Sequence, residues 1–356
     1  KIISLLILQY AGKSIKIFNY SIQYPKLLKG YRNIVKKLNI WDNQQETKVY
    51  WNKDIWVGSS ETIRNNKSIY FLERISPHIP KHKKLLNDTE LGYYLAGLID
   101  GNGNIDKEIG RITIYYDIKD ISSAYMLKEM IGYGSILKIK NGVKYVISNN
   151  EGILRVITLV NGKLKLKYNQ VIENVLTKNQ LVNYKWNEIE FKKGDIKDFN
   201  NYWLTGFIDS NGSFQIKILN KLGQKLPEIK LKLQISEVPT RTSYGVENRE
   251  ILEEIRKFII NINNDKIITV RGGGINIGIR KHILDSGETS LSYYWETSSF
   301  RTIKNVICYL NKYPLQSSYK YINYLYLYKA YLLVQNKEHL SIEGVEKIKK
   351  YKKNMR

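Results

Sequence analysis

The sequence of 356 residues contains a single cysteine, Cys308, and four histidines. One cysteine cannot form an internal disulfide, and it cannot supply the ligand set of a Cys-based zinc finger. His78 and His82 are four residues apart, but Pro80 between them would break a helix that placed both side chains on one face. The scarcity of these residues excludes a disulfide scaffold and argues against a zinc site.

Long apolar runs are also missing, because no stretch reaches the roughly 18 consecutive apolar residues that suggest a membrane-spanning helix. The apolar segment Ile2–Leu8 is too short and fits a strand or a buried turn. We therefore expect no membrane partner. No presequence rich in Arg and Ser is visible, which fits synthesis inside an organelle.

Acidic residues are scarce relative to basic ones: 33 Asp and Glu stand against 57 Lys and Arg, a formal net charge of +24. Such a surplus favours a polyanionic partner, because neutralising phosphates releases counterions. A generally basic enzyme is the alternative. Proline is rare, with 6 residues, whereas 28 tyrosines and many Lys, Ile and Asn residues match an A/T-rich coding sequence. Organellar genomes fit that composition, so we expect synthesis from the mitochondrial genome and residence in the matrix.

Two stretches of nine residues, Leu95–Gly103 and Leu204–Gly212, repeat one another 109 residues apart and are identical at six positions. This spacing exceeds that of solenoid repeats and predicts two half-domains of about 100 residues or more. Asn87–Glu90 fits a capping box before the first stretch, and Asp198 or Asn200 is placed to cap the second. Both stretches end in glycine, as helices often do. Two ordinary buried helices in a duplicated fold are one interpretation.

The two stretches resemble the signature of the LAGLIDADG homing endonuclease and maturase family. Segments similar to its mitochondrial intron-encoded branch are Ser76–Lys84, Ile131–Ser135 and Tyr313–Ser318. The resemblance covers roughly residues 76–350. It implies an α+β fold, a monomer in which two αββαββα repeats form a saddle of antiparallel sheets around a pseudo-two-fold axis. The signature helices would meet at that axis, where the small residues Gly97 and Gly206 permit close contact.

In the family, the acid at the eighth signature position of each helix enters a shared metal site that promotes phosphodiester hydrolysis. Here the eighth positions are Asn102 and Asn211. Asn offers a neutral carbonyl oxygen, whereas a nuclease holds divalent ions with anionic oxygens. Asp100 and Asp209 lie about 200° away around the helix and are expected to satisfy polar groups near the helix ends.

We therefore expect cleavage to be crippled or absent. No cofactor would be required, Mg²⁺ would matter only if cleavage is retained, and metal binding at Asn102 and Asn211 would be weak at most. Natural loss of the acids and deliberate inactivation look identical in one sequence.

The chain is expected to divide into a basic N-terminal extension (1–86), a first repeat with its linker (87–197) and a second repeat (198–356). Periodicity predicts helices over residues 25–38, 121–131, 151–160, 317–334 and 341–353. It predicts strands over 111–116, 134–140, 143–147, 214–218, 229–235 and 275–280, with a hairpin turn at Asn141-Gly142. Residues 241–248 and 272–274 are expected loops, and the glycines at 272–274 lack the Lys-Ser/Thr of a phosphate loop.

Alternation in the strands places apolar side chains on one face of a sheet and polar side chains on the other. A basic concave face can enter a major groove and contact base edges, whereas a half-exposed sheet with a soluble face is the alternative. The candidate nucleic-acid contacts are Lys138, Lys140, Lys144, Lys217, Lys230, Lys232, Gln234 and Arg280. The resemblance adds Lys320 as a basic residue near the active site, with Lys138, Lys140 or Lys144 as its counterpart in the first repeat.

Three functions remain. The first is a cleavage-deficient protein that binds structured RNA, as a group I intron maturase or among the ribosomal proteins of the mitochondrial ribosome. The second is a site-specific DNA homing endonuclease, natural or inactivated at both acids. The third is a transcriptional or architectural DNA binder. The paired asparagines favour the first, because folding RNA needs a basic surface and no metal site.

Overall fold

The computed structural model describes residues 74–177, 190–223, 225–241, 247–262, 274–283 and 287–355, which all belong to one compact unit of the chain. The helix expected over residues 25–38 lies outside the described residues, as does most of the N-terminal extension. None of the described helices combines the length and the apolar character needed to cross a membrane.

The first repeat opens on helix α5, whose start is fixed by two reciprocal hydrogen bonds. The Asn87 side chain accepts one from the Glu90 amide at 2.9 Å, and the Glu90 carboxylate accepts one from the Leu86 amide at 2.8 Å. The expected capping box is confirmed, with the second bond one residue earlier than in the standard motif. The elements are α5 (Asp88–Asn102), β1 (Gly103–Ile105), β2 (Ile112–Asp117), η1 (Ile118–Asp120), α6 (Ile121–Ile131), β3 (Ser135–Ile139), β4 (Gly142–Ile147) and α7 (Asn150–Val160).

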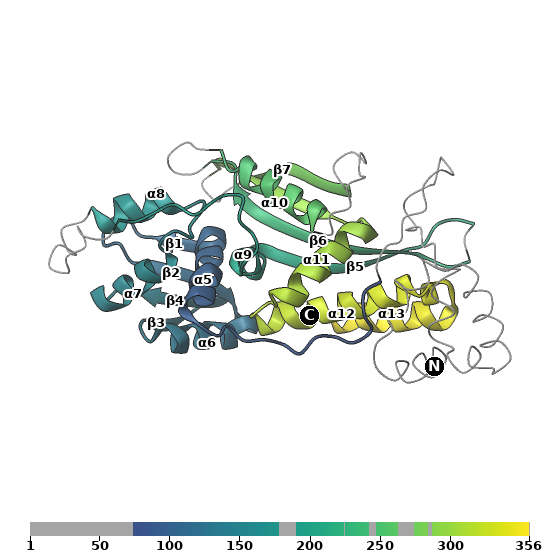
Figure 1. The fold of residues 1–356 in the computed structure, drawn as a ribbon. Helices are drawn as coiled ribbons and strands as arrows, with labels where there is room; N and C mark the ends of the chain where they lie inside the picture. The colour runs from purple at the N-terminus through teal and green to yellow at the C-terminus, as the bar shows by residue number, and fades with distance from the viewer. Residues whose placement is uncertain are drawn as a thin grey trace, which may run out of the picture. The chain divides into compact units, whose positions relative to one another are not determined.

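The second repeat follows the same plan. Its elements are α9 (Trp203–Asn211), β5 (Gly212–Leu219), β6 (Glu228–Pro239), α10 (Arg249–Asn261), β7 (Ile275–Ile283), β8 (Thr289–Thr297) and α11 (Phe300–Lys312). The antiparallel sheets have equivalent orders, β1-β2-β4-β3 and β5-β6-β8-β7 (Figure 1). The predicted fold class, two αββαββα repeats with antiparallel sheets, is confirmed. The expected caps of α9 are wrong: the side chain that accepts from the first helical amide, that of Trp203, belongs to Asn201.

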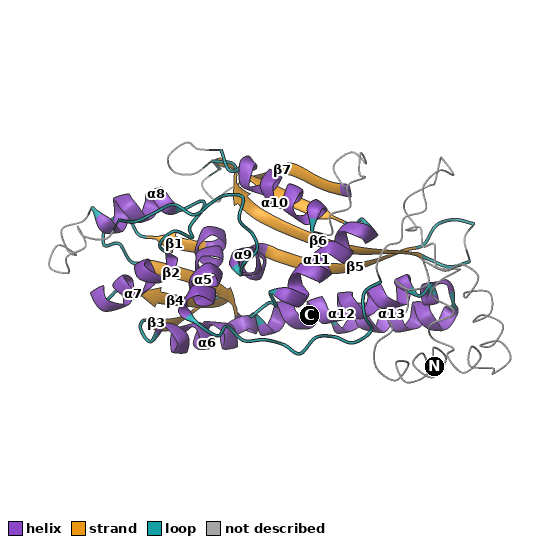
Figure 2. Ribbon diagram, in the orientation of Figure 1, coloured by secondary structure: helices purple, strands orange, loops and turns teal. Residues whose placement is uncertain are grey.

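Shorter and later helices complete the described fold (Figure 2). They are α8 (Tyr168–Val171), the π-helix η2 (Ile172–Leu176), α12 (Ser318–Gln335), η6 (Glu338–Leu340) and α13 (Ile342–Asn354). Tyr324, Tyr328 and Tyr331 of α12 are buried, so the tyrosine-rich helix contributes to the core. Ser341 caps α13 by accepting a hydrogen bond from the amide of Gly344.

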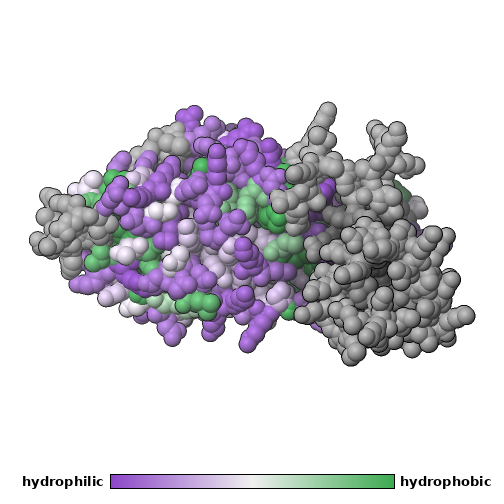
Figure 3. Space-filling model, viewed as in Figure 1, coloured by the Kyte–Doolittle hydropathy of each residue, from purple (hydrophilic) through white to green (hydrophobic). Residues whose placement is uncertain are grey.

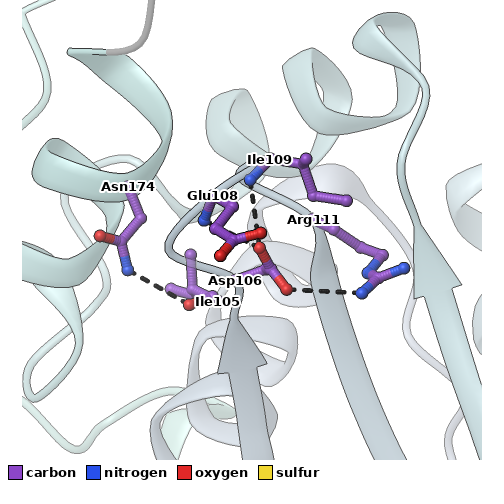
Figure 4. Close-up of polar contacts among 6 residues, drawn as sticks. All are labelled: Ile105, Asp106, Glu108, Ile109, Arg111 and Asn174. Carbon is purple, nitrogen blue, oxygen red and sulfur yellow. Dashed lines mark hydrogen bonds and ion pairs between the residues drawn. The ribbon is translucent and has the colours of Figure 1, made fainter.

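Two turns in the first repeat show how local chemistry sets strand register. Ile139 pairs with Gly142, so the β3–β4 turn consists of Lys140 and Asn141, one residue earlier than expected. In the β1–β2 turn, Asp106 accepts hydrogen bonds from backbone amides and contacts Arg111 at 3.4 Å (Figure 4). The amide bonds, with that of Ile109 the strongest influence, lower the pKa of Asp106.

Candidate nucleic-acid interface

Helices α5 and α9 pack against each other at matched glycines (Figure 1). A Cβ atom on Gly97 would stand 2.0 Å from the carbonyl oxygen of Trp203, and one on Gly206 would stand 2.1 Å from that of Tyr94. The two contacts are equivalent, because Gly97 and Gly206 are 109 residues apart and so are Tyr94 and Trp203. Only a residue without a Cβ atom lets two backbones approach so closely. The expected close contact between the signature helices is confirmed.

The acids at the sixth signature positions tie the two helices together. Trp203 on α9 donates its indole N–H to Asp100 on α5 at 2.9 Å, and Tyr94 on α5 donates its hydroxyl to Asp209 on α9 at 3.0 Å. Each acid also accepts hydrogen bonds from backbone amides, those of Lys165, Leu166 and Lys167 for Asp100 and those of Gln316 and Ser317 for Asp209. The prediction that both acids satisfy polar groups near the helix ends is confirmed.

The two acids differ in how completely they are satisfied. Both carboxylate oxygens of Asp100 accept two hydrogen bonds each. Asp209 accepts three through Oδ2, whereas its buried Oδ1 has no hydrogen-bond partner among the described residues. Burial raises the pKa of Asp100, and it raises the pKa of Asp209 to about 6. An ionised Asp209 therefore leaves part of its charge uncompensated in the core.

This difference predicts opposite responses to the same substitution. In Asp100→Asn, one pair of N–H donors must face the new NH₂ group, so we expect a loss of roughly 3 kcal/mol in the free energy of unfolding. In Asp209→Asn, the amide oxygen can keep all three donors and the NH₂ group occupies the unpartnered place, so the change at pH 7 should be near zero or stabilising. Denaturant unfolding of the two variants measures the contrast. Equal losses at both positions would contradict it.

The pH dependence gives an independent check on Asp209. Its pKa is raised from 3.8 to about 6, so its stabilising contribution is complete below about pH 4 and is lost as the pH rises through about 6. Asp209→Asn removes this titration. Its stability relative to the parent should therefore rise by up to about 3 kcal/mol between pH 4 and 7. Asp120 also raises the pKa of Asp209, so the measured difference includes the change in the titration of Asp120 when the Asp209 charge is removed.

The eighth signature positions lie at the ends of the same two helices. Asn102 is exposed, and its amide donates to the carbonyl of Tyr115 on β2 at 3.1 Å. Asn211 is half-buried. A lysine ammonium group caps each helix end: Lys167 donates to the carbonyls of Ile99 and Gly103, and Lys320 donates to those of Ile208 and Ser210.

The sequence identified Lys320 but not its partner. The equivalent place in the first repeat belongs to Lys167, and not to Lys138, Lys140 or Lys144, which lie on β3, in the β3–β4 turn and on β4. Burial lowers the pKa of Lys167 to about 8. The sequence carries no signal for this role, because the backbone amide of Lys167 binds Asp100 only once the chain has folded.

The side chains at these helix ends do not form a suitable set of ligands for a divalent ion. Asn102 and Asn211 offer neutral amides, and two ammonium groups lie close by. Both oxygens of Asp100 are occupied by N–H donors, so the Oδ1 of Asp209, unpartnered within the described ranges, is a single anionic oxygen, too few for a divalent ion. Divalent ions in nucleases are held mainly by anionic oxygens. In the part of the chain that the structure describes, no three His, Cys, Asp or Glu side chains form a group suited to a metal. The ammonium groups of Lys167 and Lys320 face the carboxylates of Asp100 and Asp209, so they balance those buried charges and cap the helix ends.

The second sheet brings most of its predicted contacts together on one face, called here the charged face. Strand register pairs Lys217 with Lys230 and Gln215 with Lys232. Ion pairs link Lys232 to Glu296 at 2.5 Å and Lys230 to Glu228 at 3.5 Å. These lysines line a hollow of about 340 Å³ that Asn276 also borders.

Two residues of the second sheet that were predicted to contact nucleic acid, Gln234 and Arg280, pack against other side chains of the protein. Gln234 lies in the same row as Glu296 but is only 7% exposed, so its neighbours cover it. Arg280 lies over the ring of Tyr294 at 4.7 Å. Hydrophilic residues dominate the described surface seen in Figure 3, and apolar residues form small separate patches there.

The first sheet does not gather its predicted lysines. Lys144 lies on the open face, in a row with Tyr115 and Leu137. Lys138 pairs with the buried Val143, which places it on the helix-facing side at the sheet edge, and Lys140 lies in the turn. The three lysines therefore do not form one basic surface.

Comparisons with known proteins agree with this geometry. A family model described as LAGLIDADG endonuclease matches residues 204–331. A cox1 intron-2 protein of Schizosaccharomyces pombe is 36% identical over 99% of both chains. The intron-encoded DNA endonuclease aI3 of Saccharomyces cerevisiae is 26% identical over 70% of this chain and 65% of its own. The intron-encoded RNA maturase bI4 of the same yeast is 28% identical over 58% of this chain and 35% of its own.

Solved structures share the fold at low sequence identity. The I-LtrWI LAGLIDADG homing endonuclease bound to target DNA superposes with a TM-score of 0.51 at 21% identity, over 76% of this chain and 99% of its own. The meganuclease I-SmaMI, bound to uncleaveable DNA, gives a TM-score of 0.51 at 19% identity, over 74% of this chain and 98% of its own. Both matches support the assignment of the two-repeat fold.

Proposed function

This chain belongs to the LAGLIDADG endonuclease family, and on that premise we propose that it binds structured RNA in mitochondria without cutting nucleic acid, as an intron maturase. The alternative role, as a component recruited to the mitochondrial ribosome, would need the same basic surface and no metal site. The observation that carries the proposal is the chemistry at the ends of α5 and α9. Asn102 and Asn211 replace both acids, while Lys167 and Lys320 remain. That combination loses the anionic ligands of a cleavage centre, while the net charge of +24 keeps the protein suited to a polyanion.

Two further observations bear on the ligand: the net charge supports a nucleic acid of either kind, and the name of one relative supports RNA. The net charge of +24 far exceeds what a small substrate would require and suits a large polyanion. One relative, matching 58% of this chain, is named an RNA maturase, whereas another, matching 70%, is named a DNA endonuclease. Both are named as intron-encoded, and a third is named for a cox1 intron. These names also support synthesis and action in the mitochondrion.

Site-specific DNA binding is the second candidate, and the charged face favours it. Lys217, Lys230 and Gln215 project from a two-stranded ribbon, a form that fits a major groove and contacts base edges. The structural relatives with the same fold were solved with DNA bound. An inactive or inactivated homing endonuclease would retain this face.

The proposal predicts that the protein does not cut DNA in magnesium or manganese, and that acids at the eighth positions restore metal binding. Asn102→Asp with Asn211→Asp adds two carboxylates beside the lysines, so the double variant should bind Mn²⁺ more tightly than the parent in calorimetry. Either single change should do less. Asp106→Asn, a change of a carboxylate in the β1–β2 turn, serves as a control and should leave metal affinity unchanged.

Site-specific double-strand cleavage by the parent protein at ordinary enzyme concentrations would overturn the proposal. A double variant that binds Mn²⁺ no better than the parent would show that the two helix ends are not arranged around a common site. Cleavage by the double variant but not by the parent would support both the loss of cleavage in this chain and the arrangement of the two helix ends around a common site.

A further inference from the structure

The open face of the first sheet is apolar where the second sheet is charged. Strand register aligns Tyr115, Lys144 and Leu137 in one row across β2, β4 and β3. Their neighbours Ile114 and Tyr145 point to the opposite face and are buried beneath the helices. The row therefore lies on the face away from the helices, where Tyr115 is 40% and Leu137 is 46% exposed.

A second row extends the same patch. Asp117, Gly142 and Ile139 are aligned on the same face, and the Ile139 side chain is 42% exposed. Tyr115, Leu137, Ile139 and Lys144 are called here the aromatic face. The two successive rows present one ring, two aliphatic side chains, the Lys144 ammonium group and the Asp117 carboxylate, which accepts a hydrogen bond from the amide of Lys119.

The fold does not require these apolar residues. Both signature glycines pair with an isoleucine, Gly103 with Ile114 and Gly212 with Ile235, which gives the two sheets a common register. In the first sheet the row of Ile114 ends at Ile136 on β3, and in the second sheet the row of Ile235 ends at Ile277 on β7. One and three residues further along these two strands, Leu137 corresponds to Gly278 and Ile139 to Arg280. Polar and small residues thus occupy the same strand positions in the second repeat, so the exposed apolar side chains have another cause.

We propose that the aromatic face binds unpaired nucleotides of RNA, with a base stacked on Tyr115 and a phosphate near Lys144. This inference rests on the proposed function and specifies which part of an RNA that function uses. Tyr115 is well placed, because its carbonyl accepts the hydrogen bond from Asn102 at the end of α5. The platform therefore begins beside the C-terminal end of α5.

The chemistry of the patch selects unpaired bases over a duplex and over a protein. Leu137 and Ile139 offer no hydrogen bonds to the base edges in a groove, whereas an unpaired base exposes a flat surface that an aromatic ring can stack on. Lys144, at the centre of the row, supplies charge complementary to a phosphate and would be left unpaired beneath an apolar protein surface.

The test compares Tyr115→Ala with two matched variants of the full chain. Tyr115→Phe keeps a ring on the aromatic face, and Tyr125→Ala removes an exposed tyrosine from α6. The probes are an unstructured RNA of about ten nucleotides and an RNA duplex of the same sequence, measured by fluorescence anisotropy. Tyr115→Ala should weaken binding of the single strand by roughly 5- to 100-fold, with little change for the duplex. The salt dependence should not change, because no charge is removed.

Each outcome separates this inference from the proposed function. Equal affinities for Tyr115→Ala and Tyr125→Ala would overturn the aromatic face while RNA binding by the parent stands, and would point to a protein on this surface. A parent protein that binds neither RNA would overturn the proposed function itself. If Tyr115→Ala unfolds, Tyr115→Thr keeps a β-branched residue suited to a strand and replaces it in the same comparison. A 5-bromouridine crosslink to the peptide containing Tyr115 would support the platform directly.

Discussion

Replacing Gly97 with alanine is expected to lower the free energy of unfolding by at least about 3 kcal/mol, although alanine is the better helix former by about 1 kcal/mol. The new Cβ atom would stand 2.0 Å from the carbonyl oxygen of Trp203 and 2.9 Å from the amide nitrogen of Phe207. Both are backbone atoms of a packed helix and cannot turn aside as a side chain would. The two signature helices must separate, and the hydrogen bonds of Asp100 and Asp209 across their interface would be strained or lost.

Gly206→Ala should behave in the same way, because its Cβ atom would meet the carbonyl oxygen of Tyr94 at 2.1 Å. Gly162→Ala is the matched control: its Cβ atom would meet nothing within 4 Å, and only its left-handed backbone, with φ of 73°, opposes the change. That control should cost about 1–2 kcal/mol. Thermal and denaturant unfolding measure the order of stability of the three variants. A Gly97→Ala variant as stable as Gly162→Ala would contradict the packing of α5 on α9.

The second large effect expected is the dependence of RNA affinity on salt. Contacts that neutralise about 6–10 phosphates should reduce affinity by roughly 10³- to 10⁵-fold between about 50 and 200 mM salt. The residues available for such contacts include Lys217 and Lys230 on the charged face and Lys144 on the first sheet. Replacing Lys217 and Lys230 with alanine should reduce the slope by about two phosphates. An unchanged slope in that variant would show that the charged face does not contact the backbone of the RNA.

The sequence could predict those parts of the fold that depend on local periodicity. Helix α6 was expected over residues 121–131 and spans Ile121–Ile131, and the alternation in residues 214–218 marks strand β5. The glycines of the two signature helices also indicated their close contact, because a residue without a Cβ atom allows two helix backbones to approach. These features depend on residues close together in the chain, which is the range over which a pattern can be recognised.

The candidate site was only partly predictable, because its interactions join residues far apart in the chain. The bond from Tyr94 to Asp209 spans 115 residues, and the lysine that caps α5 comes 68 residues after the carbonyl of Ile99. Helices α10 and α11 and strand β8 were not identified from the sequence. The placement of Lys138 on the helix-facing side followed from strand pairing and not from composition. The division into residues 1–86, 87–197 and 198–356 stays a prediction.

The central claim is that RNA, and not a DNA site, is the working ligand, and one measurement tests it most directly. Binding of the protein to a mitochondrial group I intron RNA is measured at about 200 mM salt, in competition with duplex DNA of about 20 base pairs that spans the matching intron insertion site. We predict that the RNA stays bound while the duplex competes weakly and with little dependence on its sequence, because RNA is recognised through shape and 2′-hydroxyls. Displacement of the RNA by one specific duplex, with scrambled duplexes inactive, would contradict this account and establish DNA site recognition in its place.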